Sequence, residues 1–291
     1  MRIRDKVFVV TGGGSGIGRE VVLELLEQGA RVAAVDLRAA ALAETLSMAT
    51  ARCGCAAAGR LSTHELDVTD SAAVRALPET VTAAHGQVDG LLNVAGIIQP
   101  FVRLVDLDEE HVRRVMAVNF DGVLTTVRAF LPGLLTRPEA AIVNVSSMGG
   151  LAPVPGQTVY GASKAAVGLL TEGLYAELRG TSVTVTAVYP GGVATGISEN
   201  SGVRMAGRET RETEPSRAQQ RLLTSAPPAA RQIVDGMVAG RYRVLVGWDA
   251  RAVDLLSRLA PRFATELIAR QMARLLDPAP EPAAAVSPPR P

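Results

Sequence analysis

The sequence predicts an α/β fold built on a doubly wound parallel sheet of seven strands. Two observations predict this class. Short β-branched, apolar runs alternate with longer segments of helical periodicity, as expected for strands joined by helical crossovers. The short runs are almost entirely apolar rather than alternating, which is typical of strands that helices cover on both faces. In such sheets ligands bind beyond the carboxyl ends of the strands.

The expected elements follow this alternation along the chain. The predicted strands are Lys6–Val10, Arg31–Asp36, Ser62–Asp67, Gly90–Val94, Ala141–Ser146, Ser182–Val188 and Tyr242–Val246. The predicted helices are Ile17–Gln28, Ala40–Ala51, Ser71–His85, Glu109–Thr136, Val159–Leu178 and Ala229–Gly240. Together they predict a single domain over residues 1–248.

Composition excludes several classes of function. The formal net charge is +1 and aromatic residues make up 3%, which disfavours nucleic-acid binding. Cys53 and Cys55 have no partners at metal-ligand spacing, so we expect two reduced thiols and no metal site. The amino terminus is charged within five residues, and no apolar run approaches the roughly 18 residues that span a bilayer. We therefore expect a cytoplasmic protein.

Three segments break the alternation. Residues 195–225 are polar and aperiodic, and we expect a substrate lid there. Residues 249–277 have the pattern of a helical extension that Pro261 splits, with leucines beside arginines. This extension could pack on a subunit or cover the pocket, which we favour, or lie on a membrane surface as a peripheral contact. Residues 278–291 are rich in Pro and Ala, which predicts a disordered tail.

A glycine-rich turn joins the first predicted strand to the first helix. Its sequence Thr11–Gly18 reads T-G-G-G-S-G-I-G, and this strand–turn–helix context is the one in which glycines let the backbone approach a pyrophosphate. Asp36 ends the second strand, where a carboxylate can accept hydrogen bonds from ribose hydroxyls and repel a 2′-phosphate. The glycine turn also has no basic residue, since Ser15 precedes Gly16. The acidic Asp36 and the uncharged turn both favour NAD over NADP. Arg38 argues for NADP instead, since it lies close enough in sequence to reach a 2′-phosphate if Asp36 turned away.

A tyrosine and a lysine form the candidate catalytic pair. Only two of the thirty basic residues are lysines, Lys6 and Lys164, and Lys164 follows Tyr160 by four positions. On a helix this spacing puts both side chains on one face, one turn apart. A neighbouring ammonium lowers the pKa of a phenol, so the pair predicts a tyrosine acid/base. A chance pair on a solvated helix is the alternative.

These motifs occur in a known order. The chain resembles the classical short-chain dehydrogenase/reductase family over roughly residues 4–247. Besides the glycine turn, the similarity rests on Asp67-Val68, Asn93-Val94-Ala95-Gly96, Asn119 in M-A-V-N-F-D-G, Ser147 thirteen residues before Tyr160, and Pro190–Thr195 in the pattern P-G-x-V-x-T. The second position of N-N-A-G is Val here, which is a departure. The spacing selects Ser147 over Ser146.

The resemblance implies a Rossmann-like fold and hydride transfer at a secondary alcohol or ketone. It implies the catalytic residues Asn119, Ser147, Tyr160 and Lys164. It implies cofactor contacts from Thr11, Gly12, Ser15, Gly16, Ile17, Gly18, Asp36, Asp67, Val68, Asn93, Ala95, Gly96, Tyr160, Lys164, Pro190, Gly191, Val193 and Thr195. It also implies a homodimer or homotetramer.

The substrate is less well specified. The segment Met148–Gly156 and the pair Ile97-Ile98 are apolar and uncharged, which favours a small hydrophobic alcohol or ketone such as a steroid, a lipid or an aliphatic chain. These side chains could equally be ordinary core. Two rival functions stay open: an NADPH-dependent ketoreductase, which Asp36 disfavours, and a non-catalytic dinucleotide-binding protein, which would not need the four catalytic residues.

Overall fold

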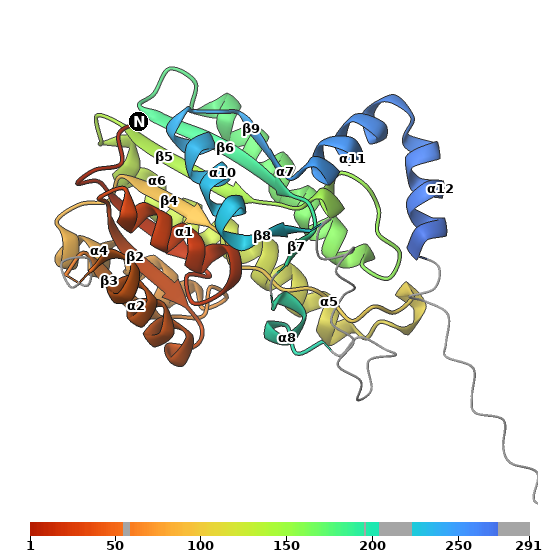
Figure 1. Ribbon diagram of the computed structural model, residues 1–291, viewed down its shortest axis with the longest axis horizontal. Coiled ribbons are helices and arrows are strands. Elements are labelled where there is room, and N and C mark those ends of the chain that lie inside the picture. The colour runs from red at the N-terminus through yellow and green to blue at the C-terminus, as the bar shows by residue number, and fades with distance from the viewer. Residues whose placement is uncertain (55–58, 195, 204–222, 273–291) are drawn as a thin grey trace, which may run out of the picture.

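The computed structural model describes residues 1–54, 59–194, 196–203 and 223–272 of the chain. Seven strands form one parallel sheet in the order β3-β2-β1-β4-β5-β6-β9, which confirms the doubly wound fold (Figure 1). The chain steps outward from β1 to β3, then crosses back and steps outward again from β4. The strands are Val7–Thr11 (β1), Arg31–Asp36 (β2), Leu61–Glu65 (β3), Gly90–Asn93 (β4), Ala140–Val145 (β5), Val183–Pro190 (β6) and Arg243–Val246 (β9).

The register of the sheet brings the ends of the central strands to one edge. Thr11 of β1 pairs with Asn93 of β4, and Asn93 pairs in turn with Asn144 of β5. The turns that follow β1, β4 and β5 therefore leave the sheet side by side. The point where the strand order reverses lies between β1 and β4, which is where ligands bind in such sheets.

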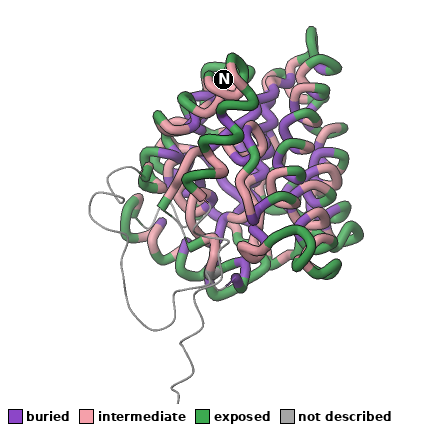
Figure 2. Tube along the Cα trace, turned by 90° about the vertical axis from the view of Figure 1, so that its right-hand side faces the viewer, coloured by how far each residue is buried: buried purple, intermediate pink, exposed green. Residues whose placement is uncertain are grey.

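Helices cover both faces of the sheet. Helices α1, α2 and α10 pack on one face of the sheet, and α4, α6 and α7 pack on the other. Each face has its own apolar core. Figure 2 shows the buried segments running through the middle of the molecule. The bounds are Gly16–Glu27 (α1), Ala39–Cys53 (α2), Ser71–His85 (α4), Gly122–Leu135 (α6), Thr158–Glu177 (α7) and Ala226–Val238 (α10).

The predicted helix Glu109–Thr136 is interrupted. Helix α5 covers Glu109–Met116, and a π-helical turn, Ala117–Asp121 (η2), joins it to α6. A π turn inserts one extra residue per turn and often occurs at functional sites. Over only five residues the spacing of apolar side chains in a π turn cannot be told from that in an α-helix. The sequence therefore did not predict this turn. Asn119 lies within this turn and is fully buried.

The end of β6 leads into short elements that the sequence did not predict. Strand β7 (Val193–Ala194) pairs with β8 (Thr224–Ser225), and helix α8 (Ile197–Asn200) follows β7. Helix α8 and strand β8 fall within the predicted lid over residues 195–225, and β7 directly precedes it. Thr195 and most of the predicted lid, residues 204–222, lie outside the described residues. Two 3₁₀ turns complete the described elements, Leu104–Asp106 (η1) and Met148–Gly150 (η3).

The carboxyl-terminal extension forms two helices. Helix α11 covers Trp248–Leu259, and α12 begins at Pro261 and ends at Met272, so the predicted split at proline is confirmed. Four large apolar side chains of these helices are more than half exposed: Trp248, Leu255, Leu259 and Phe263. Residues 273–291, with the predicted tail, are outside the described range. Within that range no helix is long and apolar enough to cross a membrane.

Candidate active site

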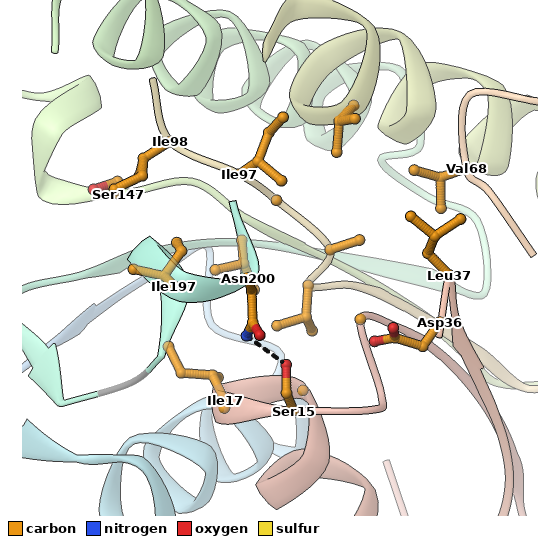
Figure 3. Close-up of a pocket in the computed structure, with 18 of the residues that line it drawn as sticks. Ser15, Ile17, Asp36, Leu37, Val68, Ile97, Ile98, Ser147, Ile197 and Asn200 are labelled. Carbon is orange, nitrogen blue, oxygen red and sulfur yellow. Dashed lines mark hydrogen bonds between the residues drawn. The ribbon is translucent and has the colours of Figure 1, made fainter. Parts of the chain in front are cut away.

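A cavity of about 710 Å³ opens at the carboxyl ends of the central strands (Figure 3). Ser15 and Ile17 come from the turn after β1, Asp36 from β2 and Ser147 from the turn after β5. Figure 3 shows Asp36, Leu37 and Val68 at one end and Ile98 with Ser147 at the other. The volume lies within the range of ligand sites in proteins, about 300–1,000 Å³.

The glycine turn is packed too tightly for side chains. Gly12 has a φ of 72°, and a Cβ there would lie 2.8 Å from the backbone nitrogen of Ala95. A Cβ on Gly18 would overlap the carbonyl oxygen of Gly12. Because neither position tolerates a larger residue, the turn brings bare backbone to the cavity wall.

Helix α1 begins at this turn with its amino end uncapped. Ser15 is the N-cap, and its side chain accepts no hydrogen bond from the first-turn N–H groups. Uncapped N–H groups at the positive end of a helix dipole can hold an anion. A dinucleotide pyrophosphate fits this arrangement.

Asp36 is held at the rim of the cavity by two backbone groups. Its carboxylate accepts hydrogen bonds from the N–H of Gly14 at 3.0 Å and from the N–H of Arg38 at 3.1 Å. A Cβ on Gly14 would come within 2.7 Å of the Asp36 carboxyl carbon, so glycine permits the approach. Arg38 lines the same cavity. The carboxylate keeps lone pairs for further donors.

Ser147, Tyr160 and Lys164 meet on one wall of the cavity. Ser147 follows β5 and caps the turn η3, where its Oγ accepts a hydrogen bond from the N–H of Gly149 at 3.0 Å. Tyr160 and Lys164 lie one turn apart on α7, as predicted. Helix α7 packs closely on the turn after Ser147, because a Cβ on Gly161 would lie 2.8 Å from the Gly149 oxygen.

Burial dominates the ionisation of this pair. Burial raises the pKa of Tyr160, and the hydrogen bond with Ser147 acts in the opposite direction. Burial lowers the pKa of Lys164 to about 8, and its Nζ donates a hydrogen bond to the Val145 carbonyl at 3.0 Å. The prediction that Lys164 lowers the tyrosine pKa is therefore wrong for this geometry. Loss of water around the phenolate outweighs the other contributions.

Three predicted residues stand behind the cavity rather than in its lining. Thr11 accepts hydrogen bonds from the N–H groups of Val94 and Ala95. Asn93 donates to Asn144 and accepts from Thr126. Their side chains tie β1, β4, β5 and α6 together, so they shape the cavity without lining it.

Asn119 is the third of these residues. Its Oδ1 accepts from the Ile97 N–H, and its Nδ2 donates to the Ile97 carbonyl and to Ser163 Oγ, all at 2.9–3.0 Å. A Cβ on Gly96 would lie 2.9 Å from Lys164 Nζ and 3.2 Å from Asn119 Oδ1. Asn119 and Lys164 therefore flank Gly96 closely.

The other predicted residues fall on the cavity wall. They are Gly12, Ser15, Gly16, Ile17, Gly18, Asp36, Asp67, Val68, Ala95, Gly96, Pro190, Gly191 and Val193, together with Ser147, Tyr160 and Lys164. Ser146 also borders the cavity, but its hydroxyl is committed to the Lys164 carbonyl at 2.6 Å.

Two contacts of the wall were not predicted. Asn200 of α8 donates a hydrogen bond to Ser15 Oγ at 3.0 Å across the cavity (Figure 3). Asp249 of α11 accepts from the Gly192 N–H at 2.6 Å and so fixes the turn after β6. Neither residue lies in a recognisable motif, so only the fold reveals the contact. No cluster of acidic, histidine or cysteine side chains within the described ranges could hold a metal ion.

Comparison with known proteins agrees with this geometry. The family profile described as short chain dehydrogenase matches residues 6–205, which include the glycine turn, Asp36 and the Ser147–Tyr160–Lys164 wall. The chain belongs to the short-chain dehydrogenase family. It is an oxidoreductase of the kind that acts on CH–OH groups.

One relative of this short-chain dehydrogenase matches nearly its whole length, and another matches two thirds of it. It is 38% identical over 273 residues to an oxidoreductase of Mycobacterium tuberculosis named SadH, covering 92% of this chain and 96% of the relative. It is 37% identical over 195 residues to a 2-keto-3-deoxy-L-fuconate dehydrogenase of Xanthomonas campestris, covering 67% and 60%.

Solved structures of the same fold include a short-chain dehydrogenase/reductase of Burkholderia phymatum in complex with NAD. It is 29% identical, with a TM-score of 0.76, covering 91% of this chain and 97% of that one. Levodione reductase is 25% identical, with a TM-score of 0.75, covering 86% and 98%. The family membership and the glycine cradle together support a nicotinamide dinucleotide cofactor for this short-chain dehydrogenase.

Proposed function

We propose that this short-chain dehydrogenase interconverts a hydrophobic secondary alcohol and its ketone with NAD. One observation carries the proposal: the hydroxyl groups of Ser147 and Tyr160 and the amine of Lys164 share one wall of the cavity whose far end holds Asp36. A bound nicotinamide supplies hydride acceptance and donation. The side chains of the chain itself supply orientation and proton exchange.

Each catalytic side chain has a separate role in this proposal. Tyr160 exchanges a proton with the substrate oxygen, as a positioned general acid/base. Ser147 donates a hydrogen bond to the same oxygen and orients it. Lys164, whose pKa of about 8 allows its charge to change near neutrality, connects Tyr160 to the Asn119 side of the wall and to solvent. Asn119 holds this relay in place.

The preference for NAD rests on Asp36. Its carboxylate faces the cavity end formed with Leu37 and Val68, where it suits ribose hydroxyls and opposes a 2′-phosphate. Arg38 lines the same end and acts in the other direction. The Burkholderia phymatum relative, which was solved with NAD, is consistent with this preference.

The hydrophobic substrate follows from the lining beside Ser147. Ile97, Ile98 and Ile197 border the cavity there, and Figure 3 shows Ile98 next to Ser147. Beyond Asp36, Arg38 and Asp67, the charged side chains among the described lining residues are Arg114 and Lys164. An apolar alcohol or ketone would bury its carbon skeleton against these isoleucines. A homodimer or homotetramer and a cytoplasmic location stay predictions.

The test is a turnover assay across secondary alcohols. Formation of reduced nicotinamide is followed by absorbance with NAD and, in parallel, with NADP, on steroids, medium-chain aliphatic alcohols and small polar diols. We expect turnover of an apolar member with NAD and a lower kcat/KM with NADP. Turnover of polar diols alone would contradict the substrate proposal, and preference for NADP would contradict the role of Asp36.

A further inference from the structure

Gln99 is a fully buried side chain that none of the motifs includes. It follows β4 by six residues and has an exposure of 0%. Its Nε2 donates a hydrogen bond to the Gly156 carbonyl at 3.0 Å. Its Oε1 accepts two hydrogen bonds, each 2.9 Å long, from the N–H groups of Val159 and Tyr160. The orientation of the amide is fixed, because only the oxygen can accept from these donors.

These two N–H groups belong to the first turn of α7. The helix begins at Thr158, and its N-cap residue, Gln157, makes no side-chain cap. The N–H groups at the second and third helical positions are those that an N-cap side chain normally satisfies. Gln99 therefore caps α7 from a segment about 60 residues away in the sequence, and one of the two capped groups is the backbone N–H of Tyr160 itself.

Gln157 secures this cap. Its Nε2 donates a hydrogen bond of 2.7 Å to the Gln99 carbonyl, and its own Oε1 has no hydrogen-bond partner among the described residues. Gln157 is itself 3% exposed. The side chain of the N-cap residue Gln157 thus bonds to the Gln99 backbone carbonyl rather than to the first-turn N–H groups of α7.

The residues just before Gln99 connect further parts of the site. The backbone N–H and the backbone C=O of Ile97 both form hydrogen bonds with the Asn119 side chain. The Ile98 N–H donates to the Ser201 hydroxyl, after α8, at 3.0 Å. Three consecutive residues therefore tie the π turn, the α8 segment and the start of α7 to the end of β4. A displacement of this segment would reach all three elements.

We propose that Gln99 is a positioning residue for the reaction: by capping α7 it fixes the backbone of Tyr160, so that the phenol meets Ser147 and the substrate oxygen. Gln99 does not line the cavity and touches no reacting atom. The inference rests on the proposed role of Tyr160 as acid/base. Side chains in an active site act only when held in the productive geometry, and a misplacement of about 1 Å can cost on the order of 10²-fold in rate.

The experiment replaces the amide with an apolar side chain of similar length. Gln99→Met removes the acceptor for both N–H groups. We expect kcat to fall by about 10²-fold while KM for NAD changes less than about threefold, because the cofactor end of the cavity is untouched. We also expect the solvent deuterium isotope effect on kcat to increase, since proton transfer from a displaced phenol becomes slower. A purely structural role would not change that effect.

Gln99→Glu is the rescue variant, because its protonated carboxyl group keeps an acceptor oxygen where Oε1 lies and donates its O–H to the Gly156 carbonyl where Nε2 does. We expect it to recover at least about tenfold of the kcat lost in Gln99→Met. Asp70→Ala is the matched control: Asp70 caps α4 by accepting from the N–H groups of Ala72 and Ala73, so this variant also uncaps a helix. It should lower thermal stability and leave kcat and the isotope effect unchanged.

Hydrogen exchange provides a readout that needs no substrate. In Gln99→Met the amides of Val159 and Tyr160 should exchange at least about tenfold faster than in the parent protein, while amides of α4 keep their rates. Faster exchange with an unchanged kcat would overturn the positioning role, and so would an equal loss of kcat in Asp70→Ala. Full turnover in Tyr160→Phe would instead overturn the proposed function, which separates the two failures.

Discussion

Helices α1 and α7 both begin at the cavity, but only the first turn of α7 has its backbone N–H groups capped by a side chain. Neither N-cap residue, Ser15 or Gln157, caps its own helix with its side chain. At α1, which begins within the glycine turn, the N-cap side chain leaves the first-turn N–H groups uncapped. At α7 the buried amide of Gln99 satisfies two of them. One helix start is open and the other is closed.

The difference follows from what each helix start has to do. An open helix start is an anion site, because its N–H groups and dipole hold a phosphate that arrives with the ligand. A closed helix start leaves no such site, but it fixes the backbone of the residues that follow. Binding a phosphate needs backbone N–H groups without a protein partner, whereas a side chain that donates a proton needs a backbone that does not move. The predictions below break or sharpen this contrast.

The largest effect is expected at Tyr160, the proposed acid/base on α7. Tyr160→Phe removes the hydroxyl and keeps the ring, so kcat should fall by about 10²–10⁴-fold, the usual contribution of a positioned acid/base. NAD affinity, measured by titration calorimetry, should stay within about threefold, because α1 and Asp36 are unchanged. Substantial remaining turnover would show that another group moves the proton.

The second variant closes the open helix. Ser15→Asp places a carboxylate at an N-cap whose extended backbone, with φ −157° and ψ 169°, suits a capping side chain. It should satisfy the first-turn N–H groups and repel the pyrophosphate. We expect the dissociation constant of NAD to rise by about 10²-fold and thermal stability to rise slightly.

Ser15→Asn separates the two contributions of that variant. Asparagine is as good an N-cap as aspartate but carries no charge, so its loss of NAD affinity should be smaller. If NAD bound to Ser15→Asp as tightly as to the parent protein, the start of α1 would not be the phosphate site.

The third variant concerns specificity at the open end. Asp36→Ala removes the carboxylate that accepts from Gly14 and Arg38. Hydrogen bonds to a charged group are worth about 1.5–3 kcal/mol, so the ratio of kcat/KM for NAD to that for NADP should fall by about 10–100-fold. Kinetics with both cofactors measure this ratio. An unchanged ratio would place the discrimination in other residues.

The smallest effect is a change in stability at the closed end. Burial lowers the pKa of Lys164 from 10.5 to about 8, so below pH 8 the native state carries a buried ammonium that the unfolded state exposes to water. Lys164→Met removes that buried charge, so it should be more stable at pH 7, by about 2 kcal/mol after allowing for the lost hydrogen bond to Val145. It should also be inactive, because it lacks the proposed proton relay.

This stability difference should depend on pH. Between pH 8 and 10.5 the native lysine loses its proton before the unfolded one, so the unfolding free energy of the parent protein rises with pH. The advantage of Lys164→Met should then shrink from pH 7 to pH 10 in urea unfolding. A constant offset across that range would mean that Lys164 is not penalised by burial.

Much of the fold and of the cofactor end could be predicted because the signals are local. The strands are apolar runs, and the Gly12–Gly18 turn lies between a strand and a helix in sequence as in space. The same holds for the spacing of Tyr160 and Lys164. Thr11 and Asn93 match a motif as well, but the structure places them behind the cavity, where they join strands.

The remainder depends on pairs of residues that are distant in the chain. The sequence alone determined the doubly wound sheet, the glycine turn, Asp36 and the cavity residues Ser147, Tyr160 and Lys164, because backbone periodicity and short spacings carry that information. Only the tertiary structure decided that Gln99 closes α7, that Asn200 reaches Ser15, and that burial rather than the Lys164 charge governs the Tyr160 pKa. Capping across space and desolvation depend on which segments pack together, and no local pattern in the chain encodes that.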